Sequence, residues 1–143
     1  MLMELLEQKV QIVQEIADWK EAIRFSAQPL LEKDSIEERY IEAMISMCEQ
    51  LDAYIVLADL FAMPHASPGS GAKVMDVALT IVKKPVDFMG KPVQVLLTLA
   101  AVDSNSHLQL LQQVATTMGD PEKIAQLIAA NDPDEILRIL AAE

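Results

Sequence analysis

Residues 75–102 read MDVALTIVKKPVDFMGKPVQVLLTLAAV. The segments 75–82 and 93–101 are the two clearest strands of the chain, because both are rich in aliphatic residues and turn signals lie between them at Lys84-Pro85 and at 90–92. The second segment is almost continuously hydrophobic, which is typical of a central strand covered on both faces. We therefore expect a sheet with helices on both sides.

Further elements extend outward from this pair of strands. The alternation in residues 9–16 predicts another strand, and residues 54–57 and 60–63 predict two short extended segments. Asp18 resembles a helix N-cap, and the helix that it begins should run to about residue 27, where Pro29 should disturb it. Ser35 resembles a second N-cap, for a helix that reaches about residue 51.

The last third of the sequence is helical in pattern. Residues 107–118 are amphipathic, and Asp120-Pro121 and Asp132-Pro133 each combine an N-cap with proline at the first helical position. We expect one domain over residues 1–143. Its predicted fold class is α/β, a three-layer sandwich with a mixed sheet of about four to five strands flanked by helices.

Composition restricts the class of protein. The net charge of −11 argues against nucleic acid or an anionic membrane surface as a partner. The longest apolar run, residues 93–102, is too short to cross a bilayer, and no secretory leader opens the chain. The single cysteine, Cys48, excludes an intrachain disulfide and is expected to pack in the core. We expect a cytoplasmic protein that does not insert into the membrane.

Residues 60–71, LFAMPHASPGSG, place His65 in a short loop between two prolines. The prolines restrict the backbone beside it, and the small residues that follow leave little bulk to cover the ring. An imidazole there can act as nucleophile, base or metal ligand. The alternative is an ordinary loop histidine.

The second histidine, His107, follows a run of helix-capping residues. A helix start presents unpaired N–H groups, which suit a phosphate, although a helix-start histidine without any chemistry is an equal alternative. Two histidines without a third ligand make a weak metal site, so none is expected. The chain has no glycine-rich nucleotide motif, and no cofactor is expected.

Three segments carry a resemblance to a known family: FAMPHASPGSGAK (61–73), DVALTIVKKPVDFMGKPVQVLLTLAAVD (76–103) and SHLQLLQQVA (106–115). In this order and spacing they resemble the mannitol/fructose-type IIA components of the bacterial phosphoenolpyruvate-dependent sugar phosphotransferase system (PTS). Residues 17–45 are similar to the ascorbate-type branch of that family. The resemblance covers the chain from about Leu2 to the last helix.

The resemblance implies a phosphocarrier on an α/β sandwich. It implies that His65 accepts a phosphoryl group from the histidine phosphocarrier protein and passes it to a cysteine of a cognate IIB protein. It also implies that His107 lies beside His65 and helps to hold the phosphoryl group. The membrane component IIC would be an indirect partner, and an ascorbate- or pentitol-like carbohydrate would be the cargo.

The sequence departs from the family at two positions. Many relatives have arginine where Ser67 stands, and mannitol-type members have a further arginine where Met47 or Cys48 stands here. Lys73 and Lys84 are the candidate substitutes. Two alternatives remain open: a regulatory module in which phosphorylation of His65 switches binding to a target protein, and a relative that has lost transfer activity.

Overall fold

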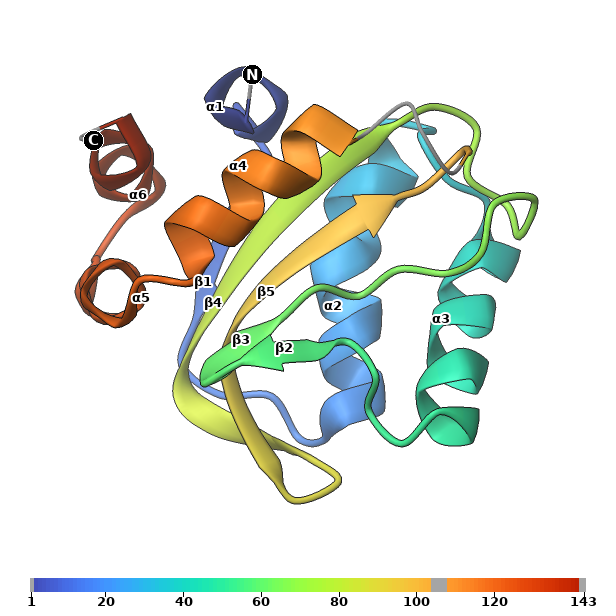
Figure 1. The fold of residues 1–143 in the computed structure, drawn as a ribbon, viewed down its shortest axis with the longest axis horizontal. Helices are drawn as coiled ribbons and strands as arrows, with labels where there is room; N and C mark the ends of the chain where they lie inside the picture. Colours follow the sequence, from blue (N-terminus) through green and yellow to red (C-terminus); the bar gives the residue numbers. More distant parts are fainter. Residues whose placement is uncertain (1, 104–107, 142–143) are drawn as a thin grey trace.

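The computed structural model describes residues 2–103 and 108–141. Within them a five-stranded sheet lies between two layers of helices (Figure 1). The sheet order is β1-β4-β5-β3-β2, with β1 parallel to β4, β3 parallel to β5, and the other two pairs antiparallel. The strands are β1 (Val10–Val13), β2 (Val56–Ala58), β3 (Leu60–Ala62), β4 (Asp76–Phe88) and β5 (Lys91–Ala100).

Helices cover both faces of the sheet. Two of them, α2 (Trp19–Glu32) and α3 (Glu38–Gln50), lie on one face. The other face carries α1 (Leu2–Leu6), α4 (Leu108–Met118), α5 (Pro121–Ala129) and α6 (Pro133–Ala141). This arrangement confirms the predicted α/β fold class, a mixed sheet flanked by helices. No helix in residues 2–103 and 108–141 combines the length and the apolar character needed to cross a bilayer.

The sheet separates two hydrophobic cores. On β4, Ala78 and Val82 pack with α2 and α3, whereas Val77, Leu79 and Ile81 pack with the helices of the other face. The same alternation holds along β5 from Val95 to Ala100, whereas Val93 packs on the α2 and α3 side, out of step with it. Both strands are therefore covered on both faces, as their hydrophobic sequences predict.

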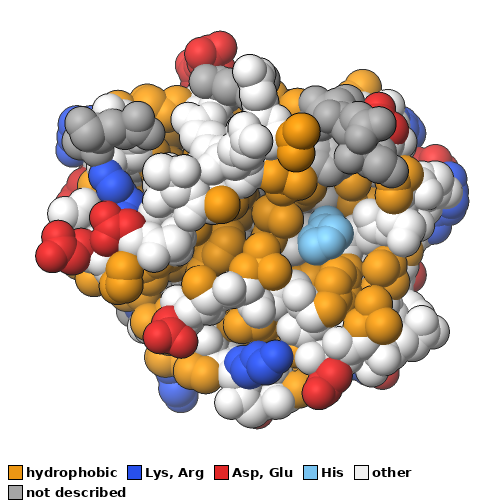
Figure 2. All heavy atoms as spheres, in the orientation of Figure 1, with side chains coloured by type: hydrophobic (Ala, Val, Ile, Leu, Met, Phe, Trp, Pro, Cys, Tyr) orange, Lys and Arg blue, Asp and Glu red, His pale blue; other side chains and the backbone are white. Residues whose placement is uncertain are grey.

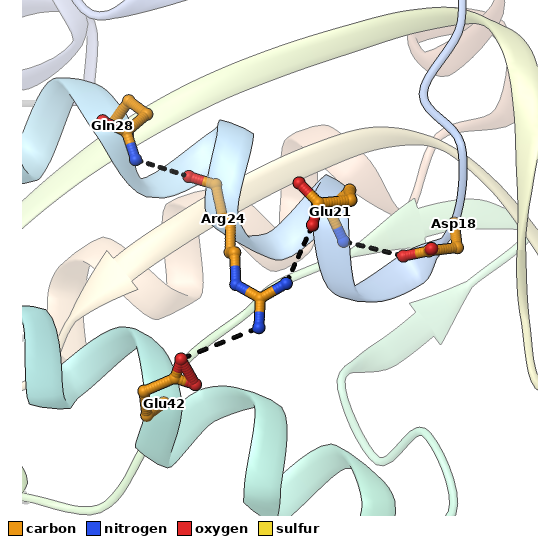
Figure 3. A network of polar contacts seen from close by, with 5 residues as sticks. All are labelled: Asp18, Glu21, Arg24, Gln28 and Glu42. Carbon is orange, nitrogen blue, oxygen red and sulfur yellow. Dashed lines mark hydrogen bonds and ion pairs between the residues drawn. The ribbon is translucent and has the colours of Figure 1, made fainter.

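Helix α2 begins as predicted and continues further than predicted. The Asp18 carboxylate accepts a hydrogen bond from the Glu21 N–H at 2.9 Å, and Arg24 links Glu21 to Glu42 of α3 (Figure 3). The expectation that Pro29 would disturb the helix is wrong, because α2 continues through it to Glu32. Proline cannot donate to the carbonyl four residues earlier, and here the Gln11 side-chain amide donates to that carbonyl, Phe25 O, at 3.0 Å.

Two other local predictions are also corrected. Ser35 does not cap α3, whose N-cap is Glu37; the Ser35 hydroxyl instead donates to the buried Asp76 carboxylate, which also pairs with Lys9. No turn forms at Lys84-Pro85, because β4 continues to Phe88 through a register shift between Ile81 and Val86. An exposed proline is tolerated at such an irregularity, since it interrupts pairing that is already shifted.

Candidate functional site

His65 lies in a hollow at one edge of the sheet. Because β3 and β5 are parallel, their carboxyl ends meet at this edge, and the His65 loop follows β3 directly (Figure 1). The hollow has a volume of about 270 Å³. Its walls come from α3, the His65 loop, the end of β5 and α4, and include Met47, Met63, Ser67, Asp103 and Leu111.

Hydrogen bonding fixes the orientation and the tautomer of the half-buried His65 ring. Its Nδ1 lies 2.7 Å from the backbone oxygen of Met63. A carbonyl oxygen can only accept, so Nδ1 carries the hydrogen in this contact. In the neutral ring the lone pair is then on Nε2, which is the nitrogen equipped for nucleophilic attack.

Tyr54 supports the same ring and its backbone. The two rings meet edge to face, with centroids 5.1 Å apart, and the Tyr54 hydroxyl donates to the His65 carbonyl oxygen. Burial raises the pKa of Tyr54, and it also raises the pKa of the buried Tyr40 on α3, whose hydroxyl accepts from the Ala66 N–H. Both phenols therefore remain protonated, neutral hydrogen-bonding groups at physiological pH.

The hollow is weakly charged. None of the lysines and arginines in the described ranges lines it. The two positions at which the family resemblance leads us to expect arginine come together here: Ser67 Oγ lies 3.8 Å from Met47 Sδ. A hydroxyl and a thioether therefore occupy this part of the wall, and neither supplies a positive charge to an anion.

The lysines suggested as substitutes are engaged elsewhere. Lys73 pairs with Asp34 at 2.5 Å, and Lys84 pairs with Glu15 at 3.3 Å. Another cation, Arg39, does contact the His65 loop: its guanidinium donates to the Gly69 carbonyl at 3.2 Å. Sequence reasoning missed Arg39, because its contact depends on how the loop folds against the start of α3.

The second predicted site residue, His107, lies outside the described residues. The chain is described as far as Asp103, which lines the hollow, and again from Leu108, where α4 begins. Cys48 is buried, as predicted, and its burial raises the pKa of the thiol to about 11. Within the described ranges, no group of three or more His, Cys, Asp or Glu side chains could hold a metal ion.

An apolar groove continues from the hollow between β3 and α4. In Figure 2 the histidine drawn in pale blue lies among hydrophobic side chains, which extend away from it across this face. The groove has a volume of about 370 Å³ and shares Met63 and Leu111 with the hollow. Phe61 and Met63 are almost completely buried and still line this groove, so both serve the core and the surface.

Comparison with known proteins identifies the family of this chain. Residues 4–143 match the family described as "Phosphoenolpyruvate-dependent sugar phosphotransferase system, EIIA 2". The ascorbate-specific PTS system EIIA component of Shigella boydii serotype 4 (strain Sb227) is 34% identical over 135 residues, covering 92% of this chain and 88% of that protein. The mannitol-specific cryptic phosphotransferase enzyme IIA component of Escherichia coli (strain K12) is 33% identical over 137 residues, covering 94% and 93%.

Solved structures give the same result. The solution structure of the mannitol-specific cryptic phosphotransferase enzyme IIA CmtB from Escherichia coli matches with a TM-score of 0.90 and 31% identity, covering 100% of both chains. The sequence match and the structural match both extend over nearly the whole chain. The chain therefore belongs to the EIIA 2 family of the phosphoenolpyruvate-dependent sugar phosphotransferase system and is a PTS IIA component.

Proposed function

We propose that residues 1–143 form one IIA domain that carries a phosphoryl group on Nε2 of His65. The observation that carries this proposal is the contact between Nδ1 of His65, which lines the hollow, and Met63 O; in the neutral ring this contact leaves the lone pair on Nε2. A nucleophilic nitrogen with a fixed orientation is what in-line attack on phosphorus requires.

The donor is the histidine phosphocarrier protein, and the acceptor is a cysteine of a cognate IIB protein. In the first step the Nε2 lone pair forms an N–P bond while the donor's N–P bond breaks, and its electron pair returns to the donor ring. In the second step the IIB thiolate forms an S–P bond, and the electron pair of the N–P bond returns to His65. His107 helps to hold the phosphoryl group.

The apolar groove beside His65 is a suitable surface for both protein partners. Both steps bring a protein against the hollow, and interface centres are typically apolar and depleted of charge. The cargo is an ascorbate- or pentitol-like carbohydrate. One compared relative is named for ascorbate, and the other is named for mannitol, which is a sugar alcohol like the pentitols but has six carbons. The protein acts in the cytoplasm and serves the membrane component IIC indirectly.

The test is intact mass after incubation with phosphoenolpyruvate, the general phosphotransferase enzyme and the histidine phosphocarrier protein. We expect a single acid-labile phosphoryl increment that His65→Ala abolishes and His107→Ala slows, followed by loss of the increment when a IIB protein is added. An active IIA protein in the same tube is the control. If that control is phosphorylated and the wild-type chain is not, the proposal is wrong.

A further inference from the structure

The backbone of residues 63–66 is held at successive polar groups. The Met63 N–H donates to Ile55 O at 2.8 Å, and the Pro64 carbonyl accepts from the Leu99 N–H at 2.9 Å. The first bond fixes the loop to the segment before β2, and the second fixes it to β5. Backbone hydrogen bonds therefore connect the His65 loop to the sheet immediately before His65.

Two tyrosine hydroxyls hold the peptide bond between His65 and Ala66. The Tyr54 hydroxyl donates to the carbonyl oxygen of this peptide, and the Tyr40 hydroxyl accepts from its N–H at 3.1 Å. These hydroxyls come from different segments, one from α3 and the other from the loop between α3 and β2. Both polar groups of one peptide are thus held by side chains that are distant from it in sequence.

Tyr40 also holds the end of β5. Its hydroxyl donates to Leu99 O at 2.8 Å and accepts from the Ala101 N–H at 3.1 Å. With the Ala66 N–H, these contacts use the one donor and both acceptor sites of a phenol. The Tyr40 side chain is completely buried. Its hydroxyl therefore links the His65 loop to the end of β5, just before Asp103, which lines the hollow.

We propose that Tyr40 and Tyr54 are positioning residues for phosphoryl transfer, which hold the His65–Ala66 peptide so that the imidazole keeps its contact with Met63 O and aims Nε2 into the hollow. This inference rests on the proposed function. Phenylalanine would fill the same volumes, so packing alone does not account for two hydroxyls, one fully buried and one half-buried, on a single peptide. Displacing a reacting group by about 1 Å lowers the rate on the order of 100-fold. The pair of tyrosine hydrogen bonds to this peptide, which we call the tyrosine clamp, should therefore affect the rate of phosphoryl transfer directly.

The test compares Tyr40→Phe and Tyr54→Phe with Ser26→Ala. The Ser26 hydroxyl is also completely buried and accepts from Thr98 Oγ1 at 2.8 Å, but it bonds neither the His65 loop nor the hollow. Rapid-quench phosphorylation by the phosphorylated histidine carrier gives the maximal rate and the donor KM. The ¹⁵N shifts of the His65 ring in the unphosphorylated protein give its tautomer, and thermal unfolding shows that each variant is folded.

We expect both phenylalanine variants to lower the maximal rate by about 10- to 100-fold at an unchanged donor KM. We also expect them to reduce the fraction of the Nδ1–H tautomer, whereas Ser26→Ala keeps the wild-type values of both. If the phenylalanine variants fold and keep the wild-type rate and tautomer, Tyr40 and Tyr54 are not positioning residues. A change in the donor KM alone would lead to the same conclusion. If the wild type accepts no phosphoryl group, the proposed function is wrong, and the tautomer measurement alone then decides the clamp. If Tyr40→Phe does not fold, Tyr54→Phe decides.

Discussion

At the level of single residues, the site combines a well-oriented histidine with few charges. The contact from Nδ1 to Met63 O sets the tautomer of His65, and Tyr54 fixes the adjacent carbonyl. No cation among the described residues lines the hollow, where Met47 and Ser67 contact each other. The local structure therefore supports the proposed attack by His65 more clearly than it would stabilise the negative charge of a phosphohistidine.

A cation at position 67 should strengthen the phosphorylated state. Ser67→Arg places a guanidinium at the rim of the hollow, since Ser67 is exposed and lines it. An exposed ion pair contributes about 0.2–1 kcal/mol, so we expect the equilibrium with the phosphorylated histidine carrier to shift about 1.5- to 5-fold towards the IIA protein. Intact masses of both proteins at equilibrium measure this. Ser67→Gln is the uncharged control, and an equal shift in that variant would exclude a charge effect.

The buried Cys48 thiol predicts a specific loss of stability at alkaline pH. Burial raises the pKa of this thiol in the folded chain from 9.0 to about 11. A raised folded-state pKa contributes stability that is complete below pH 9 and is lost as the pH rises towards 11. The wild type should therefore lose about 1 kcal/mol more unfolding free energy between pH 8 and 10 than Cys48→Ala does.

Urea unfolding at pH 8, 9 and 10 measures this difference in slope. Val114→Ala, a truncation in the opposite core, should be less stable than the wild type at every pH and keep the wild-type slope. If Cys48→Ala loses stability with pH as steeply as the wild type, the buried thiol is not responsible.

At the scale of elements, tertiary contacts decide where helices and strands end. Helix α2 passes through Pro29 because Gln11 of β1 donates to Phe25 O, the carbonyl that the proline cannot reach. Strand β4 passes through Pro85 because the register of its pairing with β5 shifts there. In both cases a residue that usually ends an element is accommodated by a neighbouring element.

The Gln11 contact should be coupled energetically to Pro29. Gln11→Met leaves Phe25 O without this donor and should lower the unfolding free energy by about 1–2 kcal/mol. In a Pro29→Ala background the backbone N–H of residue 29 can donate to Phe25 O. There Gln11→Met should lower the unfolding free energy by about 1 kcal/mol less than it does in the wild type. Urea unfolding of the four proteins gives the coupling energy. Additive effects would show that Gln11 does not replace the missing backbone bond.

The same contacts explain what the sequence could and could not predict. Strands β4 and β5, the caps at Asp18, Asp120 and Asp132, and the position of His65 after a strand are local patterns, and the structure agrees with each of them. The continuation through Pro29 and the use of Ser35 for Asp76 depend on residues 18 to 41 positions away, and no local pattern encodes them. At the site, no local pattern predicts the role of Tyr40, because its hydroxyl contacts the His65 loop and the end of β5, both of which are distant from α3 in sequence.

At the level of the whole molecule, the hollow and the apolar groove form one continuous surface through the Met63 and Leu111 that they share. The sheet edge supplies His65, and α4 supplies the opposite wall through Leu111. The groove extends along α4 to Met118, so a partner that reaches His65 also meets this helix. The fold therefore places His65, the proposed nucleophile, at one end of an apolar surface.

A charge in the groove should weaken docking and leave the chemistry unchanged. Ala115 is exposed and lines the groove, so Ala115→Glu should raise the KM for the phosphorylated histidine carrier about tenfold and leave the maximal rate within a factor of two. Thr116→Glu is the matched control, since Thr116 is exposed on the same helix but does not line the groove. Steady-state kinetics measure the donor KM of both variants. If Ala115→Glu and Thr116→Glu have the same KM for the phosphorylated histidine carrier, this groove is not the docking surface.

An NMR measurement can identify the nitrogen that carries the phosphoryl group. The protein would be labelled with ¹⁵N in its histidine rings and phosphorylated through the histidine carrier, and its ¹⁵N shifts and ³¹P couplings would then be recorded. The contact between Nδ1 and Met63 O predicts phosphorus on Nε2 of His65. Phosphorus on Nδ1 of His65, or on His107, would contradict the account.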